Sequence, residues 1–443
     1  MTFKSSVLFA FRLIFPRSAK KSSARRSIFG AILCIGISLV PLVLVMSFSE
    51  GMINGMTQRI IGLSTGELKA IVRSTAKAAS SYDSLAAYAK VLAGTEGVKD
   101  VFPQIECEGL ASGRKSRVGV AVRAVESDVF ERNEDFASLL KVKSGSIEDF
   151  KVKKKTAVIG EKVSELLELQ PGDKLRMILT KALPNGSVSP VTQTFTVSAV
   201  VSSGYQELDS MWVFIPIEQT FSVLPKTSSL YSVMMRTDGG VSADLARIRS
   251  ECEAASFGVA NVYAWFNLNR SQFENFSSTK VMLTFIMLLI VLVASVNISS
   301  ALVMLVMERR KEIAILKSIG ASSGGITISF LIAGVSCGFA GSLLGLPLGI
   351  LCAVNSNQII SALEHTVNFF SKLFYILSGN SLASFEDIHL LNPAYYLTEI
   401  PISIPFGELF LIATAVLLLS LVVSVVPAVK AGRERPLETF RKA

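Results

Sequence analysis

Four long stretches of the sequence contain no charged residue, and they constrain the fold more than any other feature. They cover residues 28–48, 281–307, 326–354 and 409–429. Crossing the hydrocarbon core of a bilayer takes about 20 apolar residues in a helix. A buried helix of a soluble protein can imitate one such stretch, but four of them predict four transmembrane helices. The first exceeds the apolar region of a signal peptide, so we expect it to stay uncleaved.

The overall composition agrees with a membrane protein. Apolar residues make up 50 % of the 443 residues and charged residues only 18 %, whereas soluble domains carry about 25 % charge. Such hydrophobicity excludes a disordered chain. Five scattered cysteines are too few for a disulfide scaffold or a zinc cluster.

The basic residues are placed where they orient the spans. Segments 1–27, 308–325 and 430–443 together hold 16 Lys and Arg against four acidic residues, whereas residues 355–408 hold one Lys against five. Positive charge collects on the cytoplasmic side of membrane proteins. We therefore predict cytoplasmic termini, and the net charge of +9 needs no nucleic-acid partner to explain it.

These assignments predict an α-helical membrane protein with four transmembrane helices plus a large extracytoplasmic α/β domain. In chain order it has a cytoplasmic N-terminal segment (1–27), a first span (28–48), a periplasmic domain (49–280), a second span (281–307), a cytoplasmic helix (308–325), a third span (326–354), a periplasmic loop (355–405), a fourth span (406–429) and a cytoplasmic tail (430–443).

The periplasmic domain is predicted to be mixed α/β, with two subdomains and an insertion over about residues 130–226. Asn185-Gly186 lies between two β-rich runs, 174–180 and 192–201, which is a strong signal for a hairpin. Further strands are expected at 69–73, 98–106, 118–125, 156–159, 212–215, 231–236 and 259–264, and helices at 85–92 and 161–167.

No motif in the chain indicates catalysis. A nucleotide-binding P-loop needs a Gly-Lys dipeptide, and the sequence contains none. Its two histidines, His365 and His389, both fall in the predicted outer loop, where surface positions are the simplest interpretation. We therefore expect no catalytic residue, no bound metal and no enzyme.

A charged turn followed by a short amphipathic helix comes after the second span. Ile313, Leu316 and Ile319 recur at helical spacing, and Gly320 suits a C-terminal cap. We predict a face that docks a cytoplasmic partner, although a basic loop at the lipid headgroups would also fit. The predicted contact residues are Glu308, Arg309, Arg310, Lys311, Glu312, Ile313, Ile315, Leu316, Ile319 and Gly320.

This segment resembles the coupling region of permeases of the lipoprotein-releasing and FtsX-like ABC superfamily. Further similar segments follow in the family's order, at 11–26 (an N-terminal elbow), 45–52, 158–173, 293–307 and 426–441. The run Val-Ala-Ser-Val-Asn-Ile at 293–298 resembles the lipoprotein-releasing (LolC/LolE-type) branch in particular. The outer segment between 374 and 396 is longer than the family's usual link, and the hairpin tip has no close match.

The resemblance implies a type VII ABC permease in the bacterial inner membrane. Such a subunit binds no cofactor directly and pairs with a second permease, identical or homologous, and with two copies of an ABC ATPase that bind ATP and Mg²⁺. Its cargo would be an acylated lipoprotein, passed to a periplasmic chaperone. The chaperone would contact the hairpin residues Leu183, Pro184, Asn185, Gly186 and Pro190. An acyl cavity would be lined by Leu42, Val45, Met46, Phe285 and Met287, for which plain packing or lipid-facing roles fit equally.

Two other classes of function remain open. One is an FtsX-like regulator that relays ATPase motion to a cell-wall hydrolase, and the other is a MacB-like efflux permease. At single residues, we expect Asn297 to form an interhelical hydrogen bond and the glycines of the third span to allow close packing. Cys107 and Cys252 are predicted as buried thiols, with a periplasmic disulfide as the alternative.

Overall fold

The computed structural model forms two compact units, a membrane unit that includes residues 28–51, 276–377 and 402–434 and an exported unit that includes residues 52–275. The structure describes residues 8, 10, 23–113, 116–182, 188–226, 228–377, 388 and 402–434.

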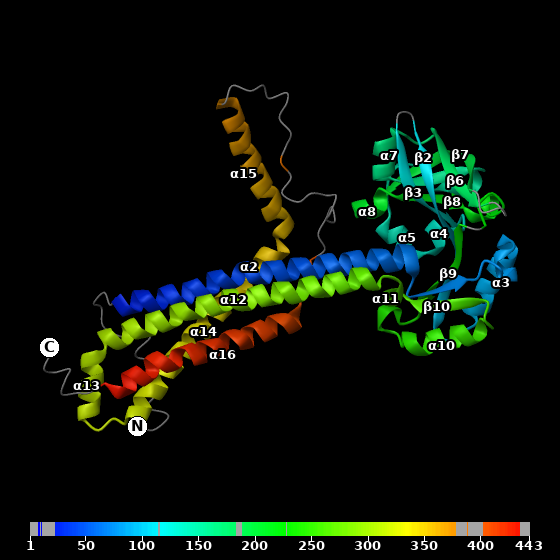
Figure 1. Cartoon of the computed structure of the whole chain (residues 1–443). Helices are drawn as coiled ribbons and strands as arrows, with labels where there is room; N and C mark the ends of the chain where they lie inside the picture. Colours follow the sequence, from blue (N-terminus) through cyan, green and yellow to red (C-terminus); the bar gives the residue numbers. More distant parts are fainter. Residues whose placement is uncertain are drawn as a thin grey trace. The chain divides into compact units, whose positions relative to one another are not determined.

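Four long helices of the membrane unit match the four uncharged stretches (Figure 1). They are α2 (Ser23–Ile60), α12 (Arg270–Glu308), α14 (Ser323–Val354) and α16 (Phe406–Arg433). Their apolar side chains share one core, which includes Leu39 and Val43 of α2, Ile298 of α12 and Phe330 of α14. Helices α2 and α12 run past their uncharged parts, and the residues beyond Gly51 and before Phe276 belong to the exported unit.

Glycines of α14 let its neighbours approach closely. A Cβ atom on Gly338 would come within 2.7 Å of Ser420 in α16, and one on Gly345 would lie 2.6 Å from the backbone oxygen of Gly36 in α2. The small residues thus form two contact faces, Gly334 and Gly338 toward α16 and Gly341, Gly345 and Gly349 toward α2. This confirms the expected close packing in the third span.

Two shorter helices complete the described part of the membrane unit. Helix α13 (Arg310–Ser318) links α12 to α14. Helix α15 (Ser356–Leu377) follows α14 directly, within the segment that we predicted as a loop. The sequence from 356 to 377 contains neither Gly nor Pro, so nothing in it interrupts a helix.

The exported unit is built on one ten-stranded sheet, in the order β10-β1-β9-β2-β3-β8-β5-β7-β4 with β6 paired to β2 and β7. Its strands are β1 (Leu68–Val72), β2 (Val98–Ser112), β3 (Arg117–Val125), β4 (Lys141–Gly145), β5 (Thr156–Gly160), β6 (Lys174–Ala182), β7 (Val188–Ser202), β8 (Trp212–Pro216), β9 (Ser229–Thr237) and β10 (Ala260–Ala264). Every strand predicted from the sequence is confirmed.

The sheet joins the two regions that we expected to form separate subdomains. Strand β3 of the first region runs parallel to β8 of the second, from Ala121 opposite Trp212 to Val125 opposite Pro216. The outer edge of β3 needs hydrogen-bond partners, and β8 supplies them. Strands of both regions therefore belong to one continuous sheet, and the division into two subdomains at about residue 130 stays a prediction.

Short helices cover the sheet and its ends. They are η1 (Ile61–Thr65), η2 (Lys77–Ala79), α3 (Tyr82–Ala93), α4 (Val129–Arg132), α5 (Glu134–Leu139), α6 (Glu148–Val152), α7 (Glu161–Leu167), α8 (Gln206–Asp209), α9 (Ile217–Thr220), η3 (Gly240–Ser242), α10 (Leu245–Ala255) and α11 (Trp265–Leu268). Cys107 and Cys252 are buried here as free thiols.

Candidate functional site

Helix α13 is tied to the end of α16 by two basic side chains. Arg310 Nε lies 2.8 Å from Glu434 Oε2, and Lys317 Nζ donates to the backbone oxygens of Gly432 and Glu434. The last carbonyls of a helix have no partner within it, so Lys317 satisfies groups that α16 leaves unpaired. The position of α13 is therefore coupled to that of the fourth span.

The predicted docking residues are divided between the two sides of α13. Ile313 is fully buried in the membrane-unit core, while Ile315 is 48 % and Ile319 79 % exposed and Leu316 is half-buried. The face predicted from Ile313, Leu316 and Ile319 is thus split, because Ile313 packs against the spans. Ile315 and Ile319, four residues apart, form the exposed apolar pair.

The charged contact residues surround this exposed pair. Arg309 pairs with Glu312 one turn later, and Lys311, Glu312 and Glu308 are exposed. Gly320 ends the helix with a φ of +97°, a conformation that glycine adopts without strain. The structure therefore presents charged and apolar side chains together at this end of the membrane unit.

An apolar cavity of about 530 Å³ opens within the membrane unit. Leu42, Met46, Phe285 and Met287 line it, so four of the five predicted cavity residues share one space, whereas Val45 does not. Helix α16 contributes Leu411, Ile412 and Ala415, which were not among the predicted residues. Their helical spacing is the signal that would have indicated them.

Three charged residues from three helices meet at this cavity. Lys280 Nζ of α12 lies 2.8 Å from Glu50 Oε2 of α2 and 2.9 Å from Glu408 Oε1 of α16, and Lys280 and Glu408 also line the cavity. Two carboxylates on one ammonium leave this triad with a formal charge of −1. Each residue lies just outside an uncharged stretch, and the sequence does not show that the three converge.

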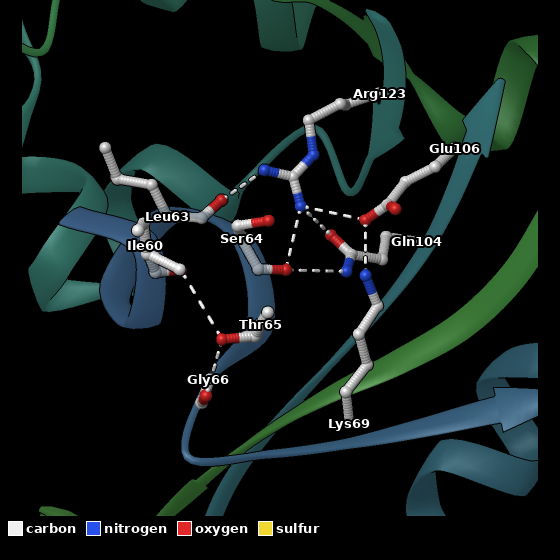
Figure 2. Close-up of polar contacts among 9 residues, drawn as sticks. All are labelled: Ile60, Leu63, Ser64, Thr65, Gly66, Lys69, Gln104, Glu106 and Arg123. Atoms are coloured by element: carbon white, nitrogen blue, oxygen red, sulfur yellow. Dashed lines mark hydrogen bonds and ion pairs between the residues drawn. The ribbon is translucent and has the colours of Figure 1, made fainter. Parts of the chain in front are cut away.

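A second polar cluster lies inside the exported unit, around the turn that follows α2 (Figure 2). Arg123 of β3 donates to the backbone oxygens of Leu63 and Ser64 and to the side chains of Gln104 and Glu106. Leu63 and Ser64 belong to η1, a single π-helical turn. Arg123 thereby fixes the end of the first long helix to the sheet.

Opposite charges lower the cost of burying Arg123. Lys69 Nζ lies 2.7 Å from Glu106 Oε1, which also accepts from Arg123 at 3.0 Å. Burial lowers the pKa of both Lys69 and Arg123, and Glu106 partly opposes this. Burial alone would raise the pKa of Glu106, but the two cations together hold it below its usual value. The carboxylate is therefore the charged hub of the cluster.

The predicted hairpin is formed by β6 and β7. Their antiparallel pairing runs from Lys174 opposite Thr196 to Ala182 opposite Val188, and Pro190 is exposed in β7. The tip, with Leu183, Pro184, Asn185 and Gly186, lies outside the described residues. Among the described residues, no group of three His, Cys, Asp or Glu side chains is placed to hold a metal ion.

Comparison with known proteins gives two matching families. Residues 28–250 match the family described as MacB-like periplasmic core domain, and residues 284–436 match the FtsX-like permease C-terminal family. The chain is 25 % identical to the lipoprotein-releasing system transmembrane protein LolC of Neisseria meningitidis serogroup B, over 78 % of this chain and 79 % of that protein. It is 23 % identical to LolE of Haemophilus influenzae, over 92 % of each.

Among solved structures, the periplasmic region of MacB from Actinobacillus actinomycetemcomitans is similar to 48 % of this chain and 94 % of that one, with 13 % identity and a TM-score of 0.31.

Proposed function

Because the chain belongs to the family of MacB-like and FtsX-like permeases, we propose that it is the membrane subunit of an ATP-driven complex that extracts lipoproteins from the inner membrane. Relatives named as lipoprotein-releasing proteins cover most of the chain. The extracted lipoprotein passes to a periplasmic chaperone for delivery to the outer membrane. The termini face the cytoplasm, as the basic segments indicate.

The apolar cavity is the observation that carries this proposal. Its volume of about 530 Å³ lies within the range of ligand pockets, roughly 300–1,000 Å³, and its walls are side chains of three spans. An acyl chain gains about 0.8 kcal/mol per buried CH₂ group. A lipoprotein with two or three chains therefore does not leave the bilayer spontaneously, and an apolar cavity lowers the cost of withdrawing them.

The energy comes from partner subunits in this proposal. Two copies of an ABC ATPase bind ATP and Mg²⁺, and the exposed side of α13, with Ile315 and Ile319, docks on them. A second permease, identical or homologous, completes the membrane part. The coupling of α13 to α16 through Arg310 and Lys317 supports transmission into the spans. The β6–β7 hairpin is the proposed contact for the chaperone.

Depletion of the protein tests the function. We expect acylated lipoproteins to accumulate in the inner membrane when the two membranes are separated, and re-expression to restore their export. Normal lipoprotein sorting would overturn the proposal. If cell division or drug resistance changed instead, the FtsX-like regulator or the MacB-like efflux permease would be the better assignment.

A further inference from the structure

Helix α15 is the part of the membrane unit that the proposed function leaves unexplained. It begins at Ser356, two residues after the last residue of α14, and extends over 22 residues to Leu377. Figure 1 shows it leaving the bundle of spans and pointing away from it. Among the described residues it packs little against the rest of the chain, whereas most helices in proteins are stabilised by packing of an apolar side.

The helix has two chemically distinct sides. At 100° per residue, Ile359, Leu363, Val367 and Phe370 fall on one side, and Leu363 and Phe370 are 50 % and 62 % exposed. The opposite side carries Ser361, Glu364, His365, Asn368 and Lys372. This is the pattern of a helix that lies between an apolar and an aqueous phase.

The polar side receives the protein's own chain. Asn368 Nδ2 donates to the backbone oxygen of Ile388 at 3.1 Å, and Asn368 Oδ1 accepts from the Ile388 amide at 2.8 Å. Ile388 thus contacts α15 on the side opposite Leu363 and Phe370. On the apolar side, Leu363 and Phe370 remain exposed in the described part of the structure, and Ile359 and Val367 are half-buried.

The last turns of α14, directly before α15, are also apolar and exposed. Leu348, Leu351 and Val354 on the last turns of α14 are all exposed, as expected of a span that contacts acyl chains. With 32 residues at 1.5 Å each, α14 is about 48 Å long and exceeds the roughly 30 Å hydrocarbon core. Its C-terminal end, and with it the start of α15, therefore lies at the lipid–water interface opposite α13.

We propose that α15 lies in this interface with its apolar side inserted among the acyl chains of the leaflet, the outer leaflet in the proposed topology. The apolar side of α15 is therefore covered by lipid and not by a protein. On the polar side of α15, Glu364 and Lys372 carry opposite charges, and His365 is the other titratable residue among the five named above. Insertion therefore depends on apolar burial and is independent of anionic headgroups. The inference rests on the membrane topology and not on the cargo.

Tryptophan substitutions with brominated lipids test the proposal. Leu363→Trp and Phe370→Trp place the probe on the apolar side, and Ser361→Trp and His365→Trp are the matched controls on the polar side. The full-length protein is reconstituted in vesicles of phosphatidylcholine brominated on its acyl chains. The parent protein, with Trp212 and Trp265 in the exported unit, gives the signal to subtract.

We expect the added tryptophans on the apolar side to be quenched at least about twofold more strongly than the controls, given an insertion depth of about 5–10 Å. The controls should respond instead to iodide in the water. Replacing part of the lipid with phosphatidylglycerol should leave the result unchanged. Equal quenching on both sides, shielding of the apolar side from both quenchers, or quenching only with anionic lipid would each overturn the proposal. Shielding from both quenchers would indicate a protein partner.

Discussion

Arg123 brings a positive charge into the interior of the exported unit, where only 2 % of its surface is exposed. Its guanidinium joins the turn after α2 to strands β2 and β3 (Figure 2). Its Cζ atom also lies 4.8 Å from the centre of the Trp212 ring, a distance at which a cation and an aromatic face attract each other. A single residue therefore couples the end of a long helix to the sheet.

Arg123→Met should destabilise the exported unit by about 2–3 kcal/mol, because the oxygens of Leu63 and Ser64 would lose the guanidinium that donates to them. Lys69 and Glu106 would still pair. Unfolding followed by tryptophan fluorescence measures this directly, since Trp212 contacts the site. The control is Arg247→Met, which removes an exposed pair with Glu251 and should cost less than about 1 kcal/mol. Equal effects of the two substitutions would contradict the role of Arg123.

The lowered pKa of Glu106 gives the cluster a pH dependence. Its stabilising contribution is present above the pKa of an unfolded glutamate, about 4.3, and decreases as the pH falls through the lower folded value. We expect Glu106→Gln to be less stable than the parent at neutral pH, with the difference shrinking below about pH 4.3. Burial raises the pKa of Glu67, Glu126 and Asp209, but these residues remain in both proteins. A difference that stayed constant from pH 7 to pH 3 would rule out the charged hub.

The contact of a single residue could be predicted from the sequence where its environment demands one kind of partner. Asn297 sits in a span and therefore needs a partner, and its Nδ2 indeed lies 2.9 Å from Cys34 Sγ of α2, which confirms the expected interhelical contact. The Arg123 cluster was not predictable, because Lys69, Glu106 and Arg123 come from three strands. In the sequence each of them has the pattern of an ordinary surface residue, and only the pairing of the strands places them side by side.

At the scale of whole elements, the glycines of α14 test how the spans pack. Gly345→Ala places a methyl group 2.6 Å from the Gly36 oxygen, so α14 and α2 must separate, at a cost of about 1–3 kcal/mol. Gly324→Ala in the same helix meets nothing within 4 Å and should be neutral or slightly stabilising, since alanine favours helix. Thermal unfolding of the purified protein compares the two. Equal midpoints would show that the close approach is not required.

Helix α13 offers an equally direct test of the proposed coupling. Ile315→Asp changes an exposed side chain, so the spans should still assemble. A carboxylate buried in a protein interface without a partner is costly, so we expect the ATPase to dissociate or its hydrolysis to become uncoupled from release. Co-purification of the ATPase and release of lipoprotein from membranes measure the two effects. Ile315→Leu should behave as the parent, and normal transport by Ile315→Asp would remove α13 from the docking surface.

The elements themselves were largely predictable, because span length and strand alternation follow from simple geometry. The predicted strands and spans correspond to elements of the structure. Helix α15 was not predicted because Glu364 and Lys372 interrupt its apolar sequence, so it is not an uncharged stretch. The burial of Ile313 was missed for a different reason. Periodicity identifies the apolar side of a short helix, but it does not show which part of that side packs against the spans.

At the scale of the whole membrane unit, the Lys280 triad connects segments that are far apart in the sequence. Glu50 follows the uncharged part of α2. Lys280 precedes the uncharged part of α12, and Glu408 precedes the uncharged part of α16. These ion pairs meet at the apolar cavity. In the proposed function the cavity admits and releases acyl chains, which requires its helices to separate and return. The triad is a contact that holds these helices together.

Charge exchange within the triad tests this role. Lys280→Glu leaves three carboxylates together, so the three helices should separate. We expect lower stability, by up to about 1 kcal/mol for each lost pair, and slower lipoprotein release. The double variant Lys280→Glu with Glu408→Lys has the same net charge as the parent and again places one ammonium beside two carboxylates. It should therefore recover much of the stability and of the release rate. Unfolding of the purified protein and release from membranes give the two readouts. Recovery of stability without release would show that Lys280 acts on the cargo, whereas an unimpaired single variant would show that the ion pairs do not hold the helices.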